Sequence, residues 1–476
     1  MLAENSTIYC ALITIECATP MSIKGDEADL SIDTSLLRDA NGFPLIPGTS
    51  IAGVLRSIAR TQQLDHLFGS TQGDEKDIHP SQLEFSFGFC HNSDNKPMIG
   101  LEAKAQSRVE QQLLNLMPIM RDQVALNEYG SAIDGAKLDR SAVPKGTRFS
   151  FEITWSTDKE DSERWSQILG WLAHPDFRLG GLTQRGFGKI KIVQLLEQRY
   201  SLKDKESFKK WQHHRSPAQL TPFKAASGKS IPIPTVQTND KDITFSLSLE
   251  AEDFWRIGQG NLALGEMGVD FDKDPNIKPY TETTIEWKGD SAEIKEQQLV
   301  IPATGIKGAL RHRTLFHLRR LNNDFADGID KQCETSNSDL KSLFGDSADE
   351  GQVGSVQFDD IYDISGVQKN GKYITKVMMH NKIDRFTGGT IDGALFSEEL
   401  LYGGQFTLTG RIKHRTGDNF VKTQNQLKAF KMALEDIAKG RLALGGGSTK
   451  GHGYFCEIES DFSQLEQAIQ QVSQQA

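Results

Sequence analysis

The chain has 476 residues and a formal net charge of −10. This length predicts two domains of roughly 200 residues each. Its five cysteines form no C-x-x-C pair, which indicates a reducing, cytoplasmic location, and no apolar run reaches the roughly 20 residues of a membrane-spanning helix. An acidic chain binds nucleic acid through local groups of basic residues, so the position of each charge matters more than the sum.

The first motif is a proline followed by a helix-like segment, and it occurs twice. Pro44–Arg60 reads PLIPGTSIAGVLRSIAR, and Ile301–Arg311 reads IPATGIKGALR. In the first copy, Thr49 or Ser50 is expected to cap the helix. Small residues at a helix start leave backbone N–H groups accessible, and such groups suit a phosphate.

Three further landmarks repeat in the same order along the chain. The pairs are Leu67–Gly69 with Leu343–Gly345, Ser131–Ala136 with Gly389–Ala394, and the glycine-rich segments Leu179–Ile192 with Leu444–Ile458. A repeated order with unequal spacing is typical of a duplicated unit whose insertions differ. The sequence therefore predicts two copies of one domain.

Each copy shows the same coarse order of elements. Alternating apolar residues predict strands at Ile8–Cys17, Arg148–Trp155, Ile243–Leu249 and Gln405–Ile412. Apolar stripes predict helices at Ser162–Leu172 and Asn425–Lys439, each before a glycine-rich segment. The resulting βαββαβ order predicts an α+β protein of two tandem ferredoxin-like or RRM-like domains with loop insertions.

Composition places the boundaries of these domains. The segment 201–240 is polar and carries four prolines, so we interpret it as a linker. The first domain is then expected at 1–200 and the second at 241–476. The basic residues of the linker, such as Lys209 and Lys210, are more simply a solvated surface than an RNA contact.

Basic residues gather near both repeated motifs. Arg56 lies in the first predicted helix, and Lys307 and Arg311 lie in a stretch of the second that contains no acid. The glycine-rich segments carry Arg185 and Lys450. Glycines allow positive φ and close approach of a nucleic-acid backbone, whereas a plain turn needs only one or two of them. The glycines concerned are Gly180, Gly181, Gly186 and Gly188 in the first copy and Gly446, Gly451 and Gly453 in the second.

These paired motifs resemble the RAMP proteins of CRISPR effector complexes. The proline–helix start and the G-G-x-x-x-x-G-x-G segment before the last strand carry the resemblance, which covers nearly the whole chain. Two units in one chain look most like a fused double backbone subunit of a type III complex. The resemblance implies a guide RNA, a target RNA and other CRISPR-associated subunits as partners.

The resemblance also implies that an aspartate between strand one and the motif helix cuts target RNA. Asp33 matches best in the first copy, with Asp26 as an alternate. In the second copy Asp290 lies 257 positions after Asp33, and Asp270 and Asp272 are alternates. RNA carries its own nucleophile, the 2′-hydroxyl, and a carboxylate can position Mg²⁺ or another divalent cation. Taken alone, an aspartate such as Asp33 also commonly caps a turn.

Three functions stay open at this point. The first is a guide-RNA-binding subunit that cleaves target RNA at two sites, one per domain. The second is a backbone subunit that binds RNA without cutting in one or both domains. The third is a precursor-RNA processing endoribonuclease, which needs a general acid or base near a glycine-rich segment, where His452 is the candidate in the second domain.

Overall fold

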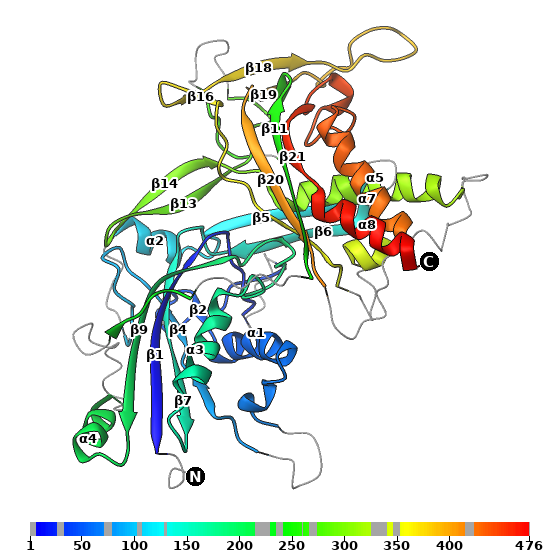
Figure 1. Cartoon of the computed structure of the whole chain (residues 1–476). Helices are drawn as coiled ribbons and strands as arrows, with labels where there is room; N and C mark the ends of the chain where they lie inside the picture. Colours follow the sequence, from blue (N-terminus) through cyan, green and yellow to red (C-terminus); the bar gives the residue numbers. More distant parts are fainter. Residues whose placement is uncertain are drawn as a thin grey trace. The chain divides into compact units, whose positions relative to one another are not determined.

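The computed structural model describes most of the chain and divides it into two compact units (Figure 1). The described residues are 6–25, 33–70, 79–101, 107–127, 131–214, 229–234, 241–258, 260–265, 274–324, 340–345, 353–414 and 423–475. The first unit comprises residues 1–183, 187–239 and 283–295, and the second comprises 184–186, 240–282 and 296–476. Each unit thus includes a short segment from the other half of the sequence.

The first unit is built on an antiparallel sheet in the order β10-β9-β1-β7-β4-β2, with β3 also pairing with β7. Its strands are β1 Thr7–Cys17, β2 Leu45–Ile46, β3 Leu83–Phe85, β4 Gly88–Cys90, β7 Arg148–Thr157, β9 Ile190–Ser201 and β10 Lys229–Ser230. The central strand β1 therefore lies between the last long strand and β7. Side chains of β1 alternate between the two faces, and both faces are covered.

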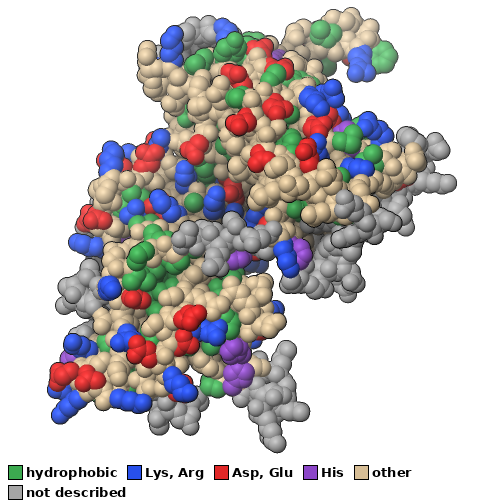
Figure 2. All heavy atoms as spheres, in the orientation of Figure 1, with side chains coloured by type: hydrophobic (Ala, Val, Ile, Leu, Met, Phe, Trp, Pro, Cys, Tyr) green, Lys and Arg blue, Asp and Glu red, His purple; other side chains and the backbone are tan. Residues whose placement is uncertain are grey.

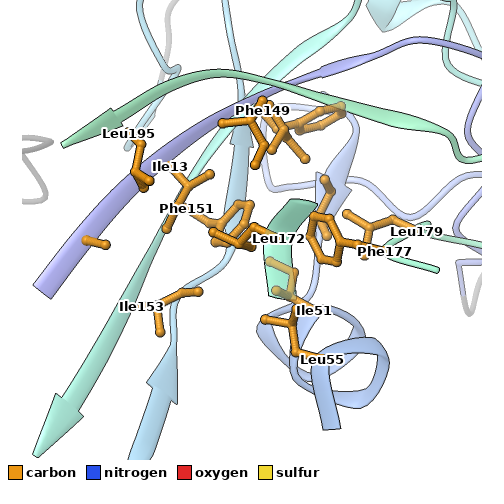
Figure 3. Close-up of a cluster of buried hydrophobic side chains, with 14 of the residues drawn as sticks. Ile13, Ile51, Leu55, Phe149, Phe151, Ile153, Leu172, Phe177, Leu179 and Leu195 are labelled. Carbon is orange, nitrogen blue, oxygen red and sulfur yellow. The ribbon is translucent and has the colours of Figure 1, made fainter. Parts of the chain in front are cut away.

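Helices α1 and α3 supply the main core of this unit. The helical elements are α1 Gly48–Thr61, η1 Asp65–Phe68, α2 Arg108–Leu114, α3 Ser162–Gly170 and η2 Trp171–Ala173. Ile51 and Leu55 recur one turn apart on α1, and both are fully buried. Figure 3 shows these two side chains with Phe151 of β7 and Leu172 of η2 in one apolar cluster. The sheet thereby fixes the motif helix.

The other face of the sheet carries α4, Lys205–His214. Trp211 of α4 is 8% exposed and packs with Ile8, Cys10, Leu196 and Tyr200 in a separate apolar cluster. The sequence interpretation of 201–240 as a linker missed this helix, because one tryptophan in a strongly polar segment gives little periodicity. The basic residues noted there belong to a helix that packs on the sheet.

Two hairpins extend from the first unit's sheet. The first pairs β5 Ile119–Leu126 with β6 Ala132–Ala142. The second joins β13 Thr281–Lys288 to β14 Ser291–Leu299, and its residues 283–295 belong to this unit. Trp287 donates its indole N–H to the Gly146 carbonyl at 2.7 Å, and the Arg148 guanidinium lies 4.0 Å from the Trp287 ring centre. A hydrogen bond to Gly146 and a cation–π contact with Arg148 therefore hold this hairpin against the start of β7.

The second unit repeats the same strand arrangement. Its main sheet has the order β21-β11-β20-β15-β8, antiparallel except for the short parallel pair β15-β8. The strands are β8 Arg185–Gly186, β11 Ile243–Ala251, β15 Val356–Asp359, β20 Gln405–Ile412 and β21 Phe455–Asp461. Smaller sheets pair β12 Phe254–Trp255 with β19 Phe396–Tyr402 and β18 Thr375–His380, and β16 Gln368–Lys369 with β17 Lys372–Tyr373.

Helices pack on one face of this second sheet. They are α5 Ala303–Leu321, α7 Gln424–Ala438, α8 Ser463–Gln475, the 3₁₀ turn η4 Ser448–Lys450 and a short helix at 340–344. Thr423 caps α7, because its hydroxyl oxygen accepts a hydrogen bond from the Gln426 N–H, and the Thr423 N–H in turn donates to Gln426 Oε1. This capping box explains why α7 begins where it does. Phe430 of α7 is fully buried against Phe245 of β11.

A shared irregularity supports the duplication at the level of hydrogen-bond register. Strand β1 shifts register against β9 between Thr14 and Ile15, and β11 shifts against β21 between Ser248 and Leu249. A β-bulge is a specific feature that bends a strand, so its recurrence at matching points of both sheets is informative. The predicted strands at 8–17, 148–155, 243–249 and 405–412 are confirmed within two residues.

Charged side chains of both signs are mixed over the face shown in Figure 2. The net negative charge is therefore not spread as one uniform field on this face. Within the described residues, no helix is long and apolar enough to cross a lipid bilayer.

Candidate nucleic-acid interface

The motif helix α1 starts directly after Pro47, without a side-chain cap. Pro47 occupies the cap position with φ −63° and ψ 138°, and no side chain accepts a hydrogen bond from the first turn. The prediction that Thr49 or Ser50 caps the helix is therefore wrong. Proline fixes an extended approach to the helix, so the helix begins at Gly48, before Thr49. A Cβ at Gly48 would lie 2.4 Å from the Phe85 carbonyl oxygen, which explains the glycine.

The equivalent helix start in the second unit already holds a carboxylate. Ala303, the first residue of α5, donates its N–H to Asp360 Oδ1 at 2.8 Å, and Asp360 is 7% exposed. A carboxylate at a helix N-terminus is favoured by the helix dipole. Gly186 packs against the same carboxylate, since a Cβ there would lie 2.1 Å from Asp360 Oδ1. Gly186 is thus required by packing, and this helix start differs from that of α1.

The predicted cations divide into surface and internal groups. Lys307 is 6% exposed and donates from Nζ to the Val356 carbonyl at 2.7 Å, so it ties α5 to β15. Arg56 is half-buried and donates to the Gly69 carbonyl at 3.0 Å, which links the first two sequence landmarks. Arg311 and Arg185 have exposed side chains. Because Lys307 is buried, the exposed arginines Arg311 and Arg320 are the cations of α5 that can reach an RNA phosphate.

The glycine-rich segments have the same geometry in both units, and most of it serves the fold. Gly188 and Gly453 have φ of 72° and 79°, and a Cβ would lie 2.1 Å and 2.3 Å from the carbonyl oxygens of Leu179 and Leu444. Such conformations and close approaches require glycine. These two glycines therefore lock the end of each segment, whether or not RNA binds.

The preceding glycines of each segment make an equivalent contact with residues that follow β1 in the first unit and β11 in the second. Gly181 donates its N–H to the Ser22 carbonyl at 2.9 Å, and Gly446 donates to the Arg256 carbonyl at 3.0 Å. A Cβ at Gly180 would lie 2.5 Å from the Ser22 carbonyl oxygen. Gly451 differs, because it has φ of 86° and no atom within 4 Å of a Cβ. Gly451 thus lies in open space beside Lys450.

Lys450 belongs to a charged cluster around the buried Glu398. The Glu398 carboxylate is 3.3 Å from Lys450 Nζ and 2.8 Å from Arg256 Nε. Burial raises the pKa of the Glu398 carboxyl, but the hydrogen bonds and charges of Arg256 and then Lys450 outweigh it, so the net pKa is lowered. Lys450 Nζ also lies 4.9 Å from the Phe396 ring centre. Its ammonium is thus positioned by fixed groups.

His452 lies next to this cluster but is 8% exposed. Burial lowers its pKa; the positive charge of Lys450 adds to this effect, while the charge of Glu398 opposes it. A general acid or base must come within hydrogen-bond distance of the substrate. The burial of His452 therefore gives no support to the processing-enzyme hypothesis.

Asp33 is exposed and is held by the base of the β5–β6 hairpin. Its Oδ2 accepts a hydrogen bond from the Asp139 N–H at 2.8 Å, and the neighbouring Thr34 carbonyl accepts one from the Ser141 N–H at 3.0 Å. Asp33 is therefore bonded across 106 residues of sequence rather than to a local turn. The local turn is instead capped by Asp39, which accepts from the Phe43 N–H at 2.9 Å.

The surroundings of Asp33 are acidic. The Asp139 and Asp122 carboxylates lie on facing positions of the hairpin, and Lys137 Nζ is 3.3 Å from the first and 3.6 Å from the second. Burial and then the charge of Asp139 raise the pKa of Asp122. A protein usually contributes one or two carboxylates to Mg²⁺, which keeps waters and substrate phosphates as its other ligands. An exposed Asp33 fits that requirement.

Asp290 occupies a different environment. It lies at the turn of the β13–β14 hairpin in residues 283–295 of the first unit, and its Oδ1 accepts from Asn95 Nδ2 at 2.8 Å. The sequence contained a signal for this hairpin, since Gly289-Asp290 separates two β-like runs. Asp26, Asp270 and Asp272 lie outside the described residues.

A chain of hydrogen bonds continues inward from Asn95. His91 Nδ1 lies 3.0 Å from Asn95 Oδ1, and His91 Nε2 lies 2.8 Å from the Ser150 hydroxyl, which is 2.8 Å from the Thr14 hydroxyl. Burial lowers the pKa of His91 to about 4, although the hydrogen bond with Asn95 opposes the shift. The hairpin turn is therefore connected to the central strand through a neutral histidine.

The lowered pKa of His91 predicts that the first unit is less stable in acid. An unfolded histidine takes a proton below about pH 6.5, whereas folded His91 does so only near pH 4. The free energy of unfolding of the first unit should therefore fall by about 3 kcal/mol as the pH falls from 6.5 to 4. Urea unfolding followed by tryptophan fluorescence measures this change, because five of the six tryptophans lie in the first unit. His91→Gln should weaken the pH dependence of the free energy of unfolding, and His66→Gln, an exposed control, should leave it unchanged. The same pH dependence in the unchanged chain and in both variants would contradict the assignment.

Each unit also exposes apolar side chains on its hairpin, a feature that sequence reasoning missed. Val124 of β5 and Leu138 of β6 are 51% and 55% exposed, and Phe386, after β18 in the second unit, is 99% exposed. Asp384 fixes the latter turn by accepting hydrogen bonds from the Phe386 and Thr387 N–H groups. The sequence did carry a signal for these hairpins, because the repeated segments 131–136 and 389–394 lie in them. Exposed apolar groups can contact nucleic-acid bases.

Comparison with known proteins matches the duplicated architecture. The model of the RAMP superfamily matches residues 14–191 and again residues 249–456. A curated relative, the CRISPR system Cms endoribonuclease Csm3 of Methanocaldococcus jannaschii, is 29% identical over 209 residues, which cover 40% of this chain and 81% of the relative. Two matches in one chain, each spanning one copy of the proline–helix start and the glycine-rich segment, identify this protein as a member of the RAMP superfamily.

Proposed function

We propose that this chain is a double subunit of a type III CRISPR effector complex. Two ferredoxin-like RAMP domains bind guide RNA, and the subunit cleaves complementary target RNA. The observation that carries the proposal is the exposed Asp33, held at 2.8 Å by the Asp139 N–H beside a hairpin with exposed apolar side chains. The similarity to an endoribonuclease of a CRISPR system supports the same reaction.

The chemistry requires little more than positioning. The 2′-oxygen of the target loses its proton and attacks the adjacent phosphorus, which breaks the bond to the 5′-oxygen of the next nucleotide; holding one nucleotide in the in-line geometry accelerates this step. Asp33 contributes a carboxylate whose Oδ2 is fixed by the Asp139 N–H. A divalent cation such as Mg²⁺, bound there, would neutralise the charge that develops on the phosphate. Exposed apolar residues of the hairpin, such as Leu138, would contact bases next to the cut and keep the strand in place.

A second candidate function is favoured by the position of Asp290. Its carboxylate is held by Asn95 at a hairpin turn of the first unit, which is a structural role. If Asp270 and Asp272 are also not catalytic, the second domain binds RNA without cutting. The proposal and this alternative differ in the number of cuts per subunit.

A cleavage assay separates these possibilities. The chain is co-expressed with its partner subunits and a guide RNA, and the purified complex is incubated with end-labelled target in Mg²⁺ or EDTA. Two Mg²⁺-dependent cuts at a fixed separation are expected, with none in an unmatched RNA. One cut would support the binding-only second domain, whereas a bound but intact target would contradict the enzyme.

The RNA-holding role makes a separate prediction for Arg311. Its guanidinium is exposed on α5, so Arg311→Gln should lower guide retention slightly and reduce the salt dependence by about one phosphate contact. The positions of the cuts should not change. Arg199→Gln is the matched control, because that arginine is paired with Glu160. Equal effects of both substitutions would contradict a specific contact by Arg311.

A further inference from the structure

Three side chains of different metal-ligand types meet on the face of the first unit's sheet that carries α4. Cys10 of β1, Glu152 of β7 and His214 of α4 bring one sulfur, one oxygen and one nitrogen atom within 4.8 Å of one another. Cys10 lies 142 positions before Glu152, and Glu152 lies 62 positions before His214, so only the folded sheet and helix assemble them. Among the described residues, this is the one group of three such ligands.

Strand register places the first two ligands on the same face. Cys10 pairs with Thr154 and Leu12 pairs with Glu152, and residues two apart on a strand point to one side. The Thr154 hydroxyl connects them, at 3.8 Å from Cys10 Sγ and 3.1 Å from Glu152 Oε1. Cys10 is fully buried, which keeps its sulfur inside the cluster.

The third ligand is oriented by its neighbours. The His214 ring lies 5.6 Å from the rings of both Trp211 and Tyr200, and it stacks on Trp211 at an interplanar angle of 19°. Its Nε2 is 2.9 Å from Glu152 Oε2. The aromatic rings thereby aim this nitrogen at the sheet, and the carboxylate side of the cluster is partly open to solvent, with 27% of the Glu152 side chain exposed.

The combination of ligands selects among metals. Thiolate and imidazole suit zinc, whereas Mg²⁺ and Ca²⁺ prefer oxygen ligands alone. Zinc bonds of roughly 2.0 to 2.3 Å separate the ligand atoms of a tetrahedral site by about 3.3 to 3.7 Å. The present separations, 2.9 Å for one pair and at most 4.8 Å for the others, need only small side-chain adjustments to reach that range.

We propose that Cys10, Glu152 and His214 bind a zinc ion, with water or the Thr154 hydroxyl as the fourth ligand. Binding forms a bond from the Cys10 sulfur to zinc and releases the thiol proton to solvent. The ion would join β1 and β7 to the end of α4. This helix carries the basic residues Lys209 and Lys210, so the site would hold a basic surface on the sheet. The inference is independent of the RNA chemistry proposed above.

Cobalt substitution tests the site directly. The full chain is stripped with a chelator and titrated with Co²⁺, which gives a sulfur-to-cobalt charge-transfer band when a thiolate is a ligand. One equivalent should produce the band, and one equivalent of Zn²⁺ should remove it. Cys10→Ser should abolish the band, and His214→Gln should weaken zinc binding at least about 10-fold, as measured by competition with a coloured chelator.

Matched controls come from neighbouring residues. His213→Gln changes the exposed histidine next to His214, and Cys456→Ser removes the exposed cysteine of the second unit, so both should bind zinc like the unchanged chain. His214 lies at the end of α4, so its substitution leaves the sheet intact even if Cys10→Ser fails to fold. Zinc affinity and a cobalt band that are unchanged in His214→Gln would overturn the proposal, as would the absence of any band in the unchanged chain.

Discussion

Asp33→Asn is expected to remove one of the target-RNA cuts and to leave the other intact. Asparagine keeps an oxygen that can accept the Asp139 N–H, so the loop should stay in place while the negative charge is lost. Loss of a group that acts directly on the reacting atoms lowers a rate by about 100-fold or more. The measurement is a time course of each cut with end-labelled target, at saturating Mg²⁺.

Binding and cutting must be measured on the same complexes. Asp33→Asn should retain the guide and bind target with unchanged affinity. Asp94→Asn is the matched control, since Asp94 is an exposed aspartate of the same unit. Unchanged rates at both positions in Asp33→Asn would show that this carboxylate is not catalytic, and Asp26 would become the candidate.

The same assay addresses the second acid. Asp290→Ala should leave both cuts if Asp290 only anchors the hairpin turn through Asn95. Asp270→Ala or Asp272→Ala should then remove the remaining cut, if the second domain is active. Loss of that cut in Asp290→Ala, with the first unit still folded, would return Asp290 to the catalytic role that its spacing predicts.

Gly453→Ala is expected to destabilise the second unit by about 3 kcal/mol or more, whereas Gly451→Ala should cost about 1 kcal/mol. Both glycines lie in one segment with similar φ, 79° and 86°. An added Cβ meets the Leu444 carbonyl oxygen at 2.3 Å in the first case and no atom within 4 Å in the second. The difference between the two variants therefore isolates the close backbone approach from the strain of a positive φ.

Hydrogen exchange of the β21 amides measures these free energies within the intact chain. Gly453→Ala should speed exchange in β21 much more than Gly451→Ala does. Gly188→Ala should have the same effect on β9, because its Cβ would lie 2.1 Å from the Leu179 carbonyl oxygen. Equal protection in the Gly451 and Gly453 variants would mean that the segment relaxes without cost and that its glycines are not there for packing.

The duplication, the long strands and the main helices were readable from the sequence, because each depends on local pattern. Alternation at 405–412 gives β20, and the apolar stripe that ends in Ile437 gives α7. Repeated motifs in a fixed order revealed two copies without any knowledge of contacts. The choice of Asp33 came from the family resemblance together with its position before the proline–helix motif, and its catalytic role stays a prediction.

What the sequence could not decide depends on contacts between distant residues. Nothing local says that Lys307 is buried against the Val356 carbonyl, that Asp360 occupies the start of α5, or that Asp290 joins the first unit. Glycine count alone does not separate a packed glycine from an open one, because the distinction lies in which carbonyl approaches it. The ligand group of Cys10, Glu152 and His214 exists only because β1 pairs with β7 and α4 packs over them. Chemistry that is assembled across a sheet is set by register and packing, which only the tertiary structure defines.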